Sequence, residues 1–263
     1  MHRLDKYELY ELAVQSPEVQ IDIFQLIYWE INKKTAIRFR EDFCGTFKMS
    51  EVWVKWDEKS LALALDLDPE PLAYGKKNHY DPLLADQKRR LVFKRKNVIS
   101  VTSPKVDIIG ASNFSFYCIK ERSELLRYFR CCLKSLGKKG ILILEMAGGA
   151  GFVEKHRETK QVKKSKGNKF RYVWDQKSFD PVKRNGLYAI HFEFKNGSKL
   201  KNAFVYDWRI WTIPEVQDAL TEAGFKETCV YWDKSPNNVS TNYVRVKKAP
   251  NDHAWVAQIV GIK

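Results

Sequence analysis

Between residues 37 and 145 the chain alternates apolar runs of strand length with helical segments, and this alternation restricts the fold more than any other feature. The apolar runs occupy residues 37–43, 61–67, 91–101, 106–111 and 140–145, and the expected helices occupy residues 46–56, 69–78 and 121–136. This order is typical of a mainly parallel sheet with helices on both faces, which binds ligands at the carboxyl ends of its strands. The sequence therefore predicts an α/β fold.

The rest of the chain divides around this core. Residues 1–34 have apolar residues at loosely helical spacing, broken near Ser16 and Pro17, which predicts two short N-terminal helices. The core itself spans 35–149. Residues 209–263 return to a helix and two strands that complete the core sheet.

An antiparallel insertion is predicted over residues 150–208. Apolar and polar residues alternate there with a period of two, which is typical of half-buried strands. The pairs Asn185-Gly186 and Asn196-Gly197 are good hairpin turns.

Composition indicates where the protein is located and what kind of partner it could bind. The longest apolar runs are far shorter than the roughly 20 residues that cross a bilayer, and the first ten residues do not resemble a signal peptide, so we expect a cytoplasmic protein. Five cysteines without a C-x-x-C pair predict free thiols and no metal site. The net charge of +14 and the basic clusters at 88–96 and 155–184 suit an anionic partner or a solvated surface.

Two carboxylates follow neighbouring strands of the core. Glu41 ends the first expected strand, just before Cys44 and Gly45, and Asp66 ends the second, 25 residues later. A carboxylate after the second strand suits hydrogen bonds to ribose hydroxyls, which indicates a ligand containing adenosine. The turn holds Gly45 alone, whereas a dinucleotide needs several glycines beside its pyrophosphate. NAD and FAD are therefore disfavoured.

These residues resemble the motifs of the class I, Rossmann-like S-adenosylmethionine-dependent methyltransferases. The resemblance rests on FREDFCGT at 39–46 and ALDLDPE at 64–70, and it continues through VDII at 106–109, GILIL at 140–144 and WTIPE at 211–215. It covers most of the chain outside the insertion. Phe43 and Phe47 depart from the pattern, because they stand where the family usually has glycines.

The resemblance implies S-adenosylmethionine as cofactor and S-adenosylhomocysteine as product. Carried over by position, the cofactor-binding residues are Arg40, Glu41, Cys44, Gly45, Asp66, Leu67, Asn97, Val98 and Asn113. Glu41 and Gly45 would border the methionine part, Asp66 the ribose, and Asn113 the sulfonium. Leu67, Asn97 and Val98 would lie beside the adenine ring. The residues alone leave simpler roles open: solvated carboxylates for Glu41 and Asp66, turn capping for Asn113, and pairing with a nearby acid for Arg40.

The candidate acceptor-binding residues are polar-tipped aromatic or charged side chains on or just after the insertion, with ordinary core packing as the alternative. They are Tyr172, Trp174, Tyr206 and Arg209, together with His191, Asp207 and Trp208. Related small-molecule methyltransferases often orient an anionic acceptor with an arginine in this region, which favours Arg209. Tyr7, Tyr10 and Gln15 either form a lid over the cofactor or belong to a helix packed on the sheet.

The sequence thus predicts a methyltransferase that acts on a small acceptor by direct methyl displacement, which needs alignment and exclusion of water more than a dedicated base. Two alternatives remain open at this point. One is an RNA or protein methyltransferase that uses the basic surface. The other is a cofactor-binding relative without turnover. The acceptor atom and the oligomeric state do not follow from the sequence.

Overall fold

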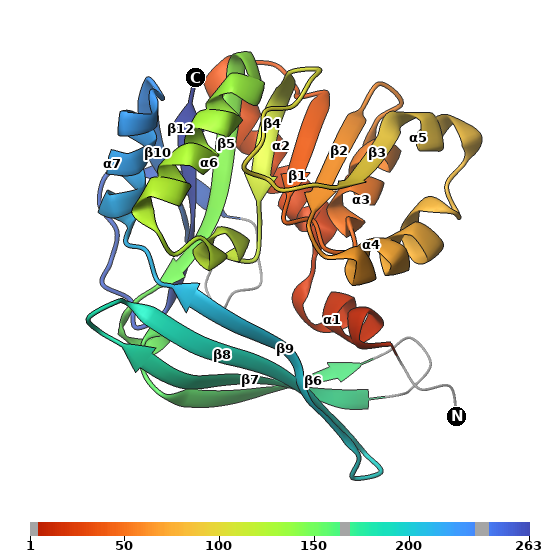
Figure 1. Cartoon of the computed structure of the whole chain (residues 1–263), viewed down its shortest axis with the longest axis vertical. Helices are drawn as coiled ribbons and strands as arrows, with labels where there is room; N and C mark the ends of the chain where they lie inside the picture. Colours follow the sequence, from red (N-terminus) through yellow and green to blue (C-terminus); the bar gives the residue numbers. More distant parts are fainter. Residues whose placement is uncertain (1–4, 164–168, 235–241) are drawn as a thin grey trace.

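The computed structural model describes residues 5–163, 169–234 and 242–263, in which the strands form two sheets (Figure 1). The larger sheet has eight strands in the order β11-β10-β12-β5-β4-β1-β2-β3. Five of them are parallel: β1 (Arg38–Asp42), β2 (Leu61–Asp66), β3 (Leu91–Arg95), β4 (Val106–Ala111) and β5 (Leu136–Gly148). The other three, β10 (Glu227–Asp233), β11 (Tyr243–Val246) and β12 (Trp255–Ile262), extend the sheet with antiparallel pairs.

Helices cover both faces of this sheet. Along β5, Ile141 and Ile143 face the cluster that contains α2 and α3, and Leu142 and Leu144 face the cluster that contains α6 and α7. Alternate side chains of a strand point to opposite faces, so this central strand must be apolar throughout. The helices are α2 (Pro17–Asn32), α3 (Lys48–Trp56), α4 (Pro69–Gly75), α5 (Ala85–Arg90), α6 (Arg122–Ser135) and α7 (Ile213–Ala223). Short helical turns are η1 (Lys76–Tyr80), η2 (Ser115–Cys118) and η3 (Ala150–Phe152).

The second sheet is the antiparallel insertion. It contains β6 (His156–Lys163), β7 (Lys169–Asp180), β8 (Asn185–Phe194) and β9 (Lys199–Arg209). Helix α1 (Lys6–Val14) lies between this sheet and α4 of the core (Figure 1). The predicted α/β fold with a mainly parallel sheet and an antiparallel insertion is confirmed.

Several details differ from the sequence prediction. Residues 79–90, expected as a polar connection, contain the end of η1 and all of α5, and the strand expected over 91–101 ends at Arg95. Asn185 and Gly186 lie at the start of β8, because the preceding hairpin turns at residues 181–184, where Arg184 supplies the positive φ. Strands β6 and β11 were not expected. Within the described ranges, no helix is long and apolar enough to cross a membrane.

Candidate functional site

The carboxyl ends of β1, β2 and β4 meet at one edge of the sheet. The turn that joins β1 to α3, which contains Gly45, lies at this edge. Asp66, at the end of β2, accepts hydrogen bonds from the backbone N–H of Gly45 at 2.7 Å and of Asp68 at 2.9 Å. The Asp66 side chain is partly exposed, and a carboxylate offers about four lone-pair sites, so it retains acceptor capacity for a ligand. Leu67, which follows it, is exposed.

Phe43 and Phe47 occupy the turn in the left-handed backbone conformation that usually requires glycine. Their φ angles are +54° and +49°. A non-glycine residue in this region costs about 1–2 kcal/mol. Phe47 offsets this cost by complete burial and by stacking on Phe93 with ring centroids 4.7 Å apart. The turn thus has the left-handed backbone conformation that glycine favours, although phenylalanine stands at both positions.

Glu41 lies buried beside this turn. Its Oε2 accepts hydrogen bonds from the Ser50 N–H at 2.9 Å and the Ser50 hydroxyl at 2.5 Å, so it satisfies a free N–H in the first turn of α3. Burial, with a smaller contribution from nearby Asp66, raises the pKa of Glu41 to about 7, although the hydrogen bonds from Ser50 lower it in part. A cation bound here would favour the ionised form.

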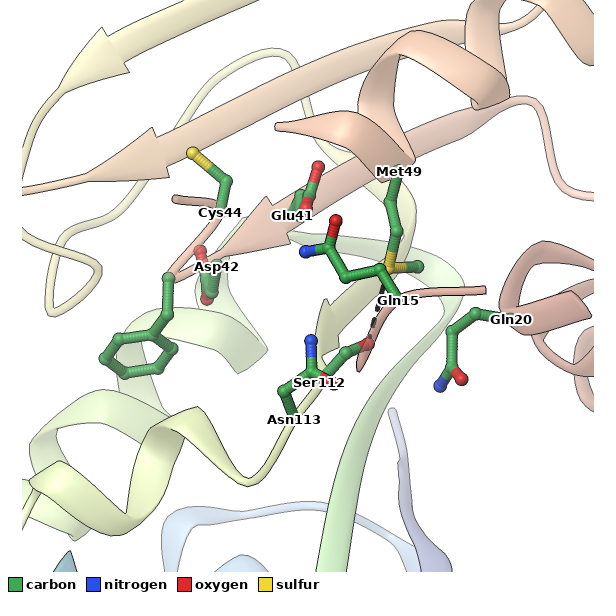
Figure 2. Close-up of a pocket in the computed structure, with 9 residues that line it drawn as sticks. Gln15, Gln20, Glu41, Asp42, Cys44, Met49, Ser112 and Asn113 are labelled. Atoms are coloured by element: carbon green, nitrogen blue, oxygen red, sulfur yellow. Dashed lines mark hydrogen bonds between the residues drawn. The ribbon is translucent and has the colours of Figure 1, made fainter. Parts of the chain in front are cut away.

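A cavity of about 40 Å³ opens next to Glu41 (Figure 2). Its lining comprises Gln15, Gln20, Glu41, Asp42, Phe43, Cys44, Met49, Ser112 and Asn113. The buried Oε1 of Gln15 has no hydrogen-bond partner among the described residues. Gln20 Nε2 makes no hydrogen bond of normal geometry there either, although it lies close enough to Glu145 to lower that group's pKa. Unpaired buried polar atoms are costly, so both amides are suited to a polar ligand.

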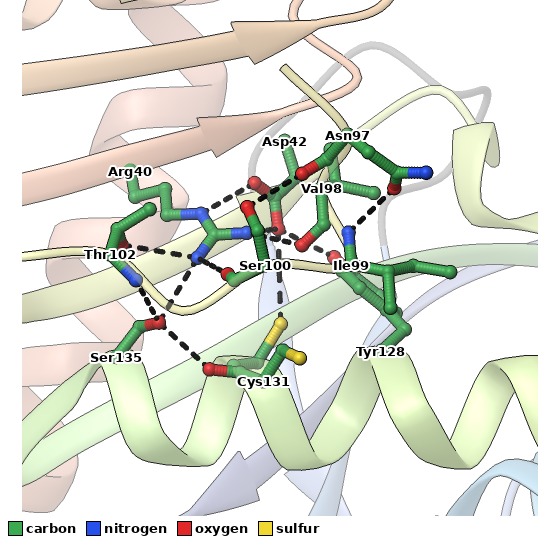
Figure 3. A network of polar contacts seen from close by, with 11 residues as sticks. Arg40, Asp42, Asn97, Val98, Ile99, Ser100, Thr102, Tyr128, Cys131 and Ser135 are labelled. Atoms are coloured by element: carbon green, nitrogen blue, oxygen red, sulfur yellow. Dashed lines mark hydrogen bonds and ion pairs between the residues drawn. The ribbon is translucent and has the colours of Figure 1, made fainter.

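Arg40 does not reach this cavity, contrary to the expected contact with the cofactor. Its guanidinium is completely buried and pairs with Asp42, the alternative of a nearby acid (Figure 3). The remaining N–H groups donate to the carbonyls of Val98 and Ser100 and to the hydroxyls of Thr102 and Ser135. These hydrogen bonds stabilise the loop after β3. Because all five N–H donors of Arg40 are used, none is left for a ligand.

That loop carries the two residues expected beside adenine. Val98 is buried in the core cluster, and its carbonyl accepts a hydrogen bond from Arg40 at 2.7 Å. Asn97 is exposed, and its Oδ1 accepts from the Ile99 N–H at 2.8 Å, which closes a local turn. Asn97 therefore uses its side-chain oxygen within the loop, and the residue itself is exposed.

Asn113 lies where two cavities adjoin, because it lines both of them. Its φ of +54° places it in a left-handed turn, and its N–H donates to Glu145 Oε2 at 2.5 Å. Glu145 also accepts from Gln258 at 3.3 Å, and burial raises the pKa of this carboxyl. Sequence reasoning missed Glu145 and Gln20, since one lies within an apolar strand and the other on a helix remote in the chain.

The second cavity, of about 480 Å³, lies between the core and the insertion. Tyr172, Trp174 and Gln176 line it from alternate positions of β7, and Tyr206 and Trp208 line it from β9. Its other walls come from α1, the loop after β4, the end of β5 and the loop after it, β6, β8 and the start of β12 with the residues just before it. These residues are Tyr10, Val14, Asn113, Phe114, Ala147, Gly151, Phe152, Glu154, His156, Glu158, Ile190, His253, Ala254, Trp255 and Val256.

Tyrosine hydroxyls and stacked rings dominate this cavity. Tyr206 and Trp208 stack with centroids 4.4 Å apart, and Trp174 lies 6.2 Å from both. Tyr10 of α1 lies close enough to Tyr206 for each hydroxyl to affect the pKa of the other, and burial raises the pKa of Tyr10 to about 12. The hydroxyls are therefore neutral at physiological pH and available as hydrogen-bond donors and acceptors.

Three of the candidate acceptor residues lie elsewhere. Arg209 and His191 follow Trp208 and Ile190, and successive side chains of a strand point to opposite faces. Arg209 stacks on Trp211 at 3.7 Å and donates to the Lys120 carbonyl, and His191 pairs with Asp175 at 3.1 Å. The third, Asp207, is exposed and pairs with Lys120 at 2.5 Å. The expected contact between Arg209 and an anionic acceptor is not supported by this position.

No family sequence model and no curated protein sequence matches the chain. Similar solved structures include DesVI of Streptomyces venezuelae, at 14% identity and TM-score 0.73 over 99% of both chains. An S-adenosylmethionine-dependent methyltransferase from Clostridium acetobutylicum matches at 14% identity and TM-score 0.70, over 98% of this chain and 96% of that one. CalS10, an amino pentose methyltransferase from Micromonospora echinaspora solved with bound S-adenosylmethionine, matches at 14% and 0.69 over 98% of both. The chain has the fold of S-adenosylmethionine-dependent methyltransferases.

Proposed function

We propose that this protein is a methyltransferase that binds S-adenosylmethionine at the edge of the core sheet and methylates a small acceptor held in the larger cavity. The observation that carries the proposal is the position of Asn113, which lines both the small polar cavity beside Glu41 and the large aromatic cavity under the insertion. A donor and an acceptor bound in adjoining cavities would meet at this residue, as direct transfer requires.

The residues present fit S-adenosylmethionine. Asp66 has acceptor capacity for the ribose hydroxyls, and the unpaired Oε1 of Gln15 suits the ammonium group of the methionine part. Glu41 adds a carboxyl group to the lining of the same cavity. When bound, the cofactor supplies a methyl group activated by its positive sulfur. Phe43 and Cys44 line the same cavity and would limit the access of water to it.

The acceptor that this cavity suits best is a small hydroxylated molecule with an amino group. The lining offers stacked aromatic faces and tyrosine hydroxyls, and its formally charged side chains at neutral pH are Glu154 and Glu158. Carboxylates at the mouth attract a cation and repel an anion. The amino pentose named for CalS10 has this chemistry, and we extend it to the present chain as part of the proposal.

The basic surface gives less support to an RNA acceptor. In the cluster at 88–96, Arg90 donates to the carbonyls of Val54, Asp57 and Ser60, and Arg95 donates to the Leu67 carbonyl. These two guanidinium groups stabilise the fold, so only part of the cluster is available to phosphates. The volume of the large cavity, about 480 Å³, is also in the range of small-molecule sites.

Calorimetric titration of the full chain with S-adenosylmethionine and S-adenosylhomocysteine tests the proposal. One-site binding that is lost in Asp66→Ala and kept in Asp218→Ala, on the distant helix α7, is the expected result. Incubation with labelled S-adenosylmethionine and a panel of amino sugars then tests transfer. The absence of cofactor binding by the folded protein would overturn the proposal, and binding without transfer to amines, sugars or RNA would favour a non-catalytic relative.

A further inference from the structure

Helix α1 touches both halves of the molecule (Figure 1). Leu9 is completely buried in an apolar cluster with Phe170, Ile190 and Phe192 of the insertion. On the side of the core, the Tyr7 ring lies 5.2 Å from that of Tyr74 on α4. The same short helix contributes Tyr10 and Val14 to the large cavity, and Gln15, directly after it, to the small one.

One carboxylate connects this helix to the first turn of the core. Glu11 Oε1 accepts a hydrogen bond from the Thr46 hydroxyl at 2.7 Å and lies 2.6 Å from His79 Nε2. Thr46 follows Gly45, whose N–H is bound to Asp66. The turn that carries Gly45 and binds Asp66 is therefore joined by one hydrogen bond to the helix that, together with Gln15, lines both cavities.

His79 is buried between two carboxylates. Its Nδ1 lies 3.2 Å from Glu51 Oε2, out of line for a good hydrogen bond, and Glu51 in turn pairs with Lys48 and Lys55 of α3. The ring also meets the edges of Phe47 and Tyr74, and the charge of Glu41 acts on it from β1. With carboxylates at both nitrogens, the imidazolium is the form that satisfies the site.

We infer that Glu11 is a positioning residue that couples the two cavities. It attaches α1 to the turn that carries Gly45 through Thr46 and His79, so that cofactor binding at this turn fixes the position of the α1 residues that line the acceptor cavity. This inference rests on the proposed function. Binding of the cofactor at the turn stabilises docked α1, which holds Tyr10, Val14 and Gln15 in place, so the acceptor meets a preformed cavity after the cofactor is bound.

The coupling has a defined pH dependence. Burial lowers the pKa of His79, but the hydrogen bonds to Glu11 and Glu51 outweigh burial and raise it, while Lys48 opposes them. Docking of α1 brings Glu11 to the ring and so favours the protonated form. By linkage, docking is strongest where His79 is protonated and weakens as the pH rises through the raised pKa.

Hydrogen exchange over residues 6–14 of the full chain, with and without saturating S-adenosylhomocysteine, measures this coupling without an acceptor. In the wild type we expect the product to slow exchange of α1. In Glu11→Gln, which keeps size and removes charge, exchange in the bound form should be roughly tenfold faster, and affinity for the product should fall by about the same factor, since coupling is reciprocal. Glu58→Gln, in an exposed turn, should match the wild type.

A pH series distinguishes a positioning role of Glu11 from a role in protein stability alone. Protection of α1, corrected for intrinsic exchange rates, should fall in the wild type as the pH rises above the ordinary histidine pKa of about 6.5, and stay constant in Glu11→Gln. Binding without added protection of α1, or equal protection and pH response in Glu11→Gln, would overturn the inference and leave the proposed function standing. A folded wild-type protein that does not bind the product would overturn both.

Discussion

The guanidinium of Arg40 and the carboxylate of Asp42, two residues apart on β1, pair with 2.7 Å between Nε and Oδ1, and neither side chain is exposed. Both point to the α6 side of the sheet, where Tyr128 donates a further hydrogen bond to Asp42 at 2.9 Å. The pair lies beneath the loop at residues 97–102 and fixes it by the carbonyl of Val98 (Figure 3). The loop expected beside adenine thus depends on a buried charge pair of the core.

Substitution of Arg40 alone should strongly reduce the stability of the protein. Arg40→Met leaves the Asp42 carboxyl buried without its partner, and we expect a loss of about 3–5 kcal/mol in the free energy of unfolding, measured by urea denaturation. The double variant Arg40→Met/Asp42→Asn should recover part of it, because no uncompensated charge remains. A loss below about 1 kcal/mol in the single variant would contradict this account of the pair.

Cofactor binding should release a proton from Glu41. Its pKa of about 7 leaves the carboxyl roughly half protonated at neutral pH, and a cation bound beside it favours the ionised form, so the proton leaves. Titrations with S-adenosylmethionine at pH 7, in two buffers of different ionisation enthalpy, should show release of up to about half a proton. Glu41→Gln should abolish the release and Glu58→Gln should keep it. Equal release in all three proteins would assign the proton to another group.

Substitution of Trp174 should affect KM for the acceptor, whereas substitution of Arg209 should not. Trp174 lines the large cavity, so Trp174→Ala should raise KM for the acceptor about tenfold or more while S-adenosylhomocysteine affinity changes little. Arg209 stacks on Trp211 outside that cavity, so Arg209→Met should leave KM within about twofold and lower the melting temperature. Steady-state kinetics with the acceptor found in the screen checks both. A large effect of Arg209→Met on KM would restore its role in acceptor binding.

Gly75 should be as sensitive to substitution as the residues of the turn between β1 and α3. A Cβ at this position would lie 2.3 Å from the Thr46 carbonyl and 2.6 Å from the Phe47 ring, which no relaxed structure tolerates. Gly75→Ala should therefore displace the turn, with a loss of about 1–3 kcal/mol in stability and weaker binding of S-adenosylhomocysteine. Gly137→Ala, where the nearest atom is 3.5 Å away, serves as the control in the same calorimetric and denaturation measurements.

The sequence by itself determined the order of the core elements and the turn at which β1 meets α3. Apolar runs of strand length separated by helical segments allow few arrangements, and parallel strands bring Glu41, Asp66 and Asn113 to one edge whatever the side chains do elsewhere. Local periodicity also predicted the antiparallel insertion, since alternation with a period of two is a property of neighbouring residues.

Only the tertiary structure decided what these side chains contact. Arg40 precedes Glu41 by one residue, yet the strand turns it to the opposite face, where Asp42 and a loop from residues 97–102 use all its donors. Arg209 is excluded from the cavity by the same alternation. Glu11, His79 and Thr46 lie far apart in the chain and meet by the packing of three separate elements. Contacts between distant segments depend on the packing of the whole chain, and local sequence patterns do not encode them.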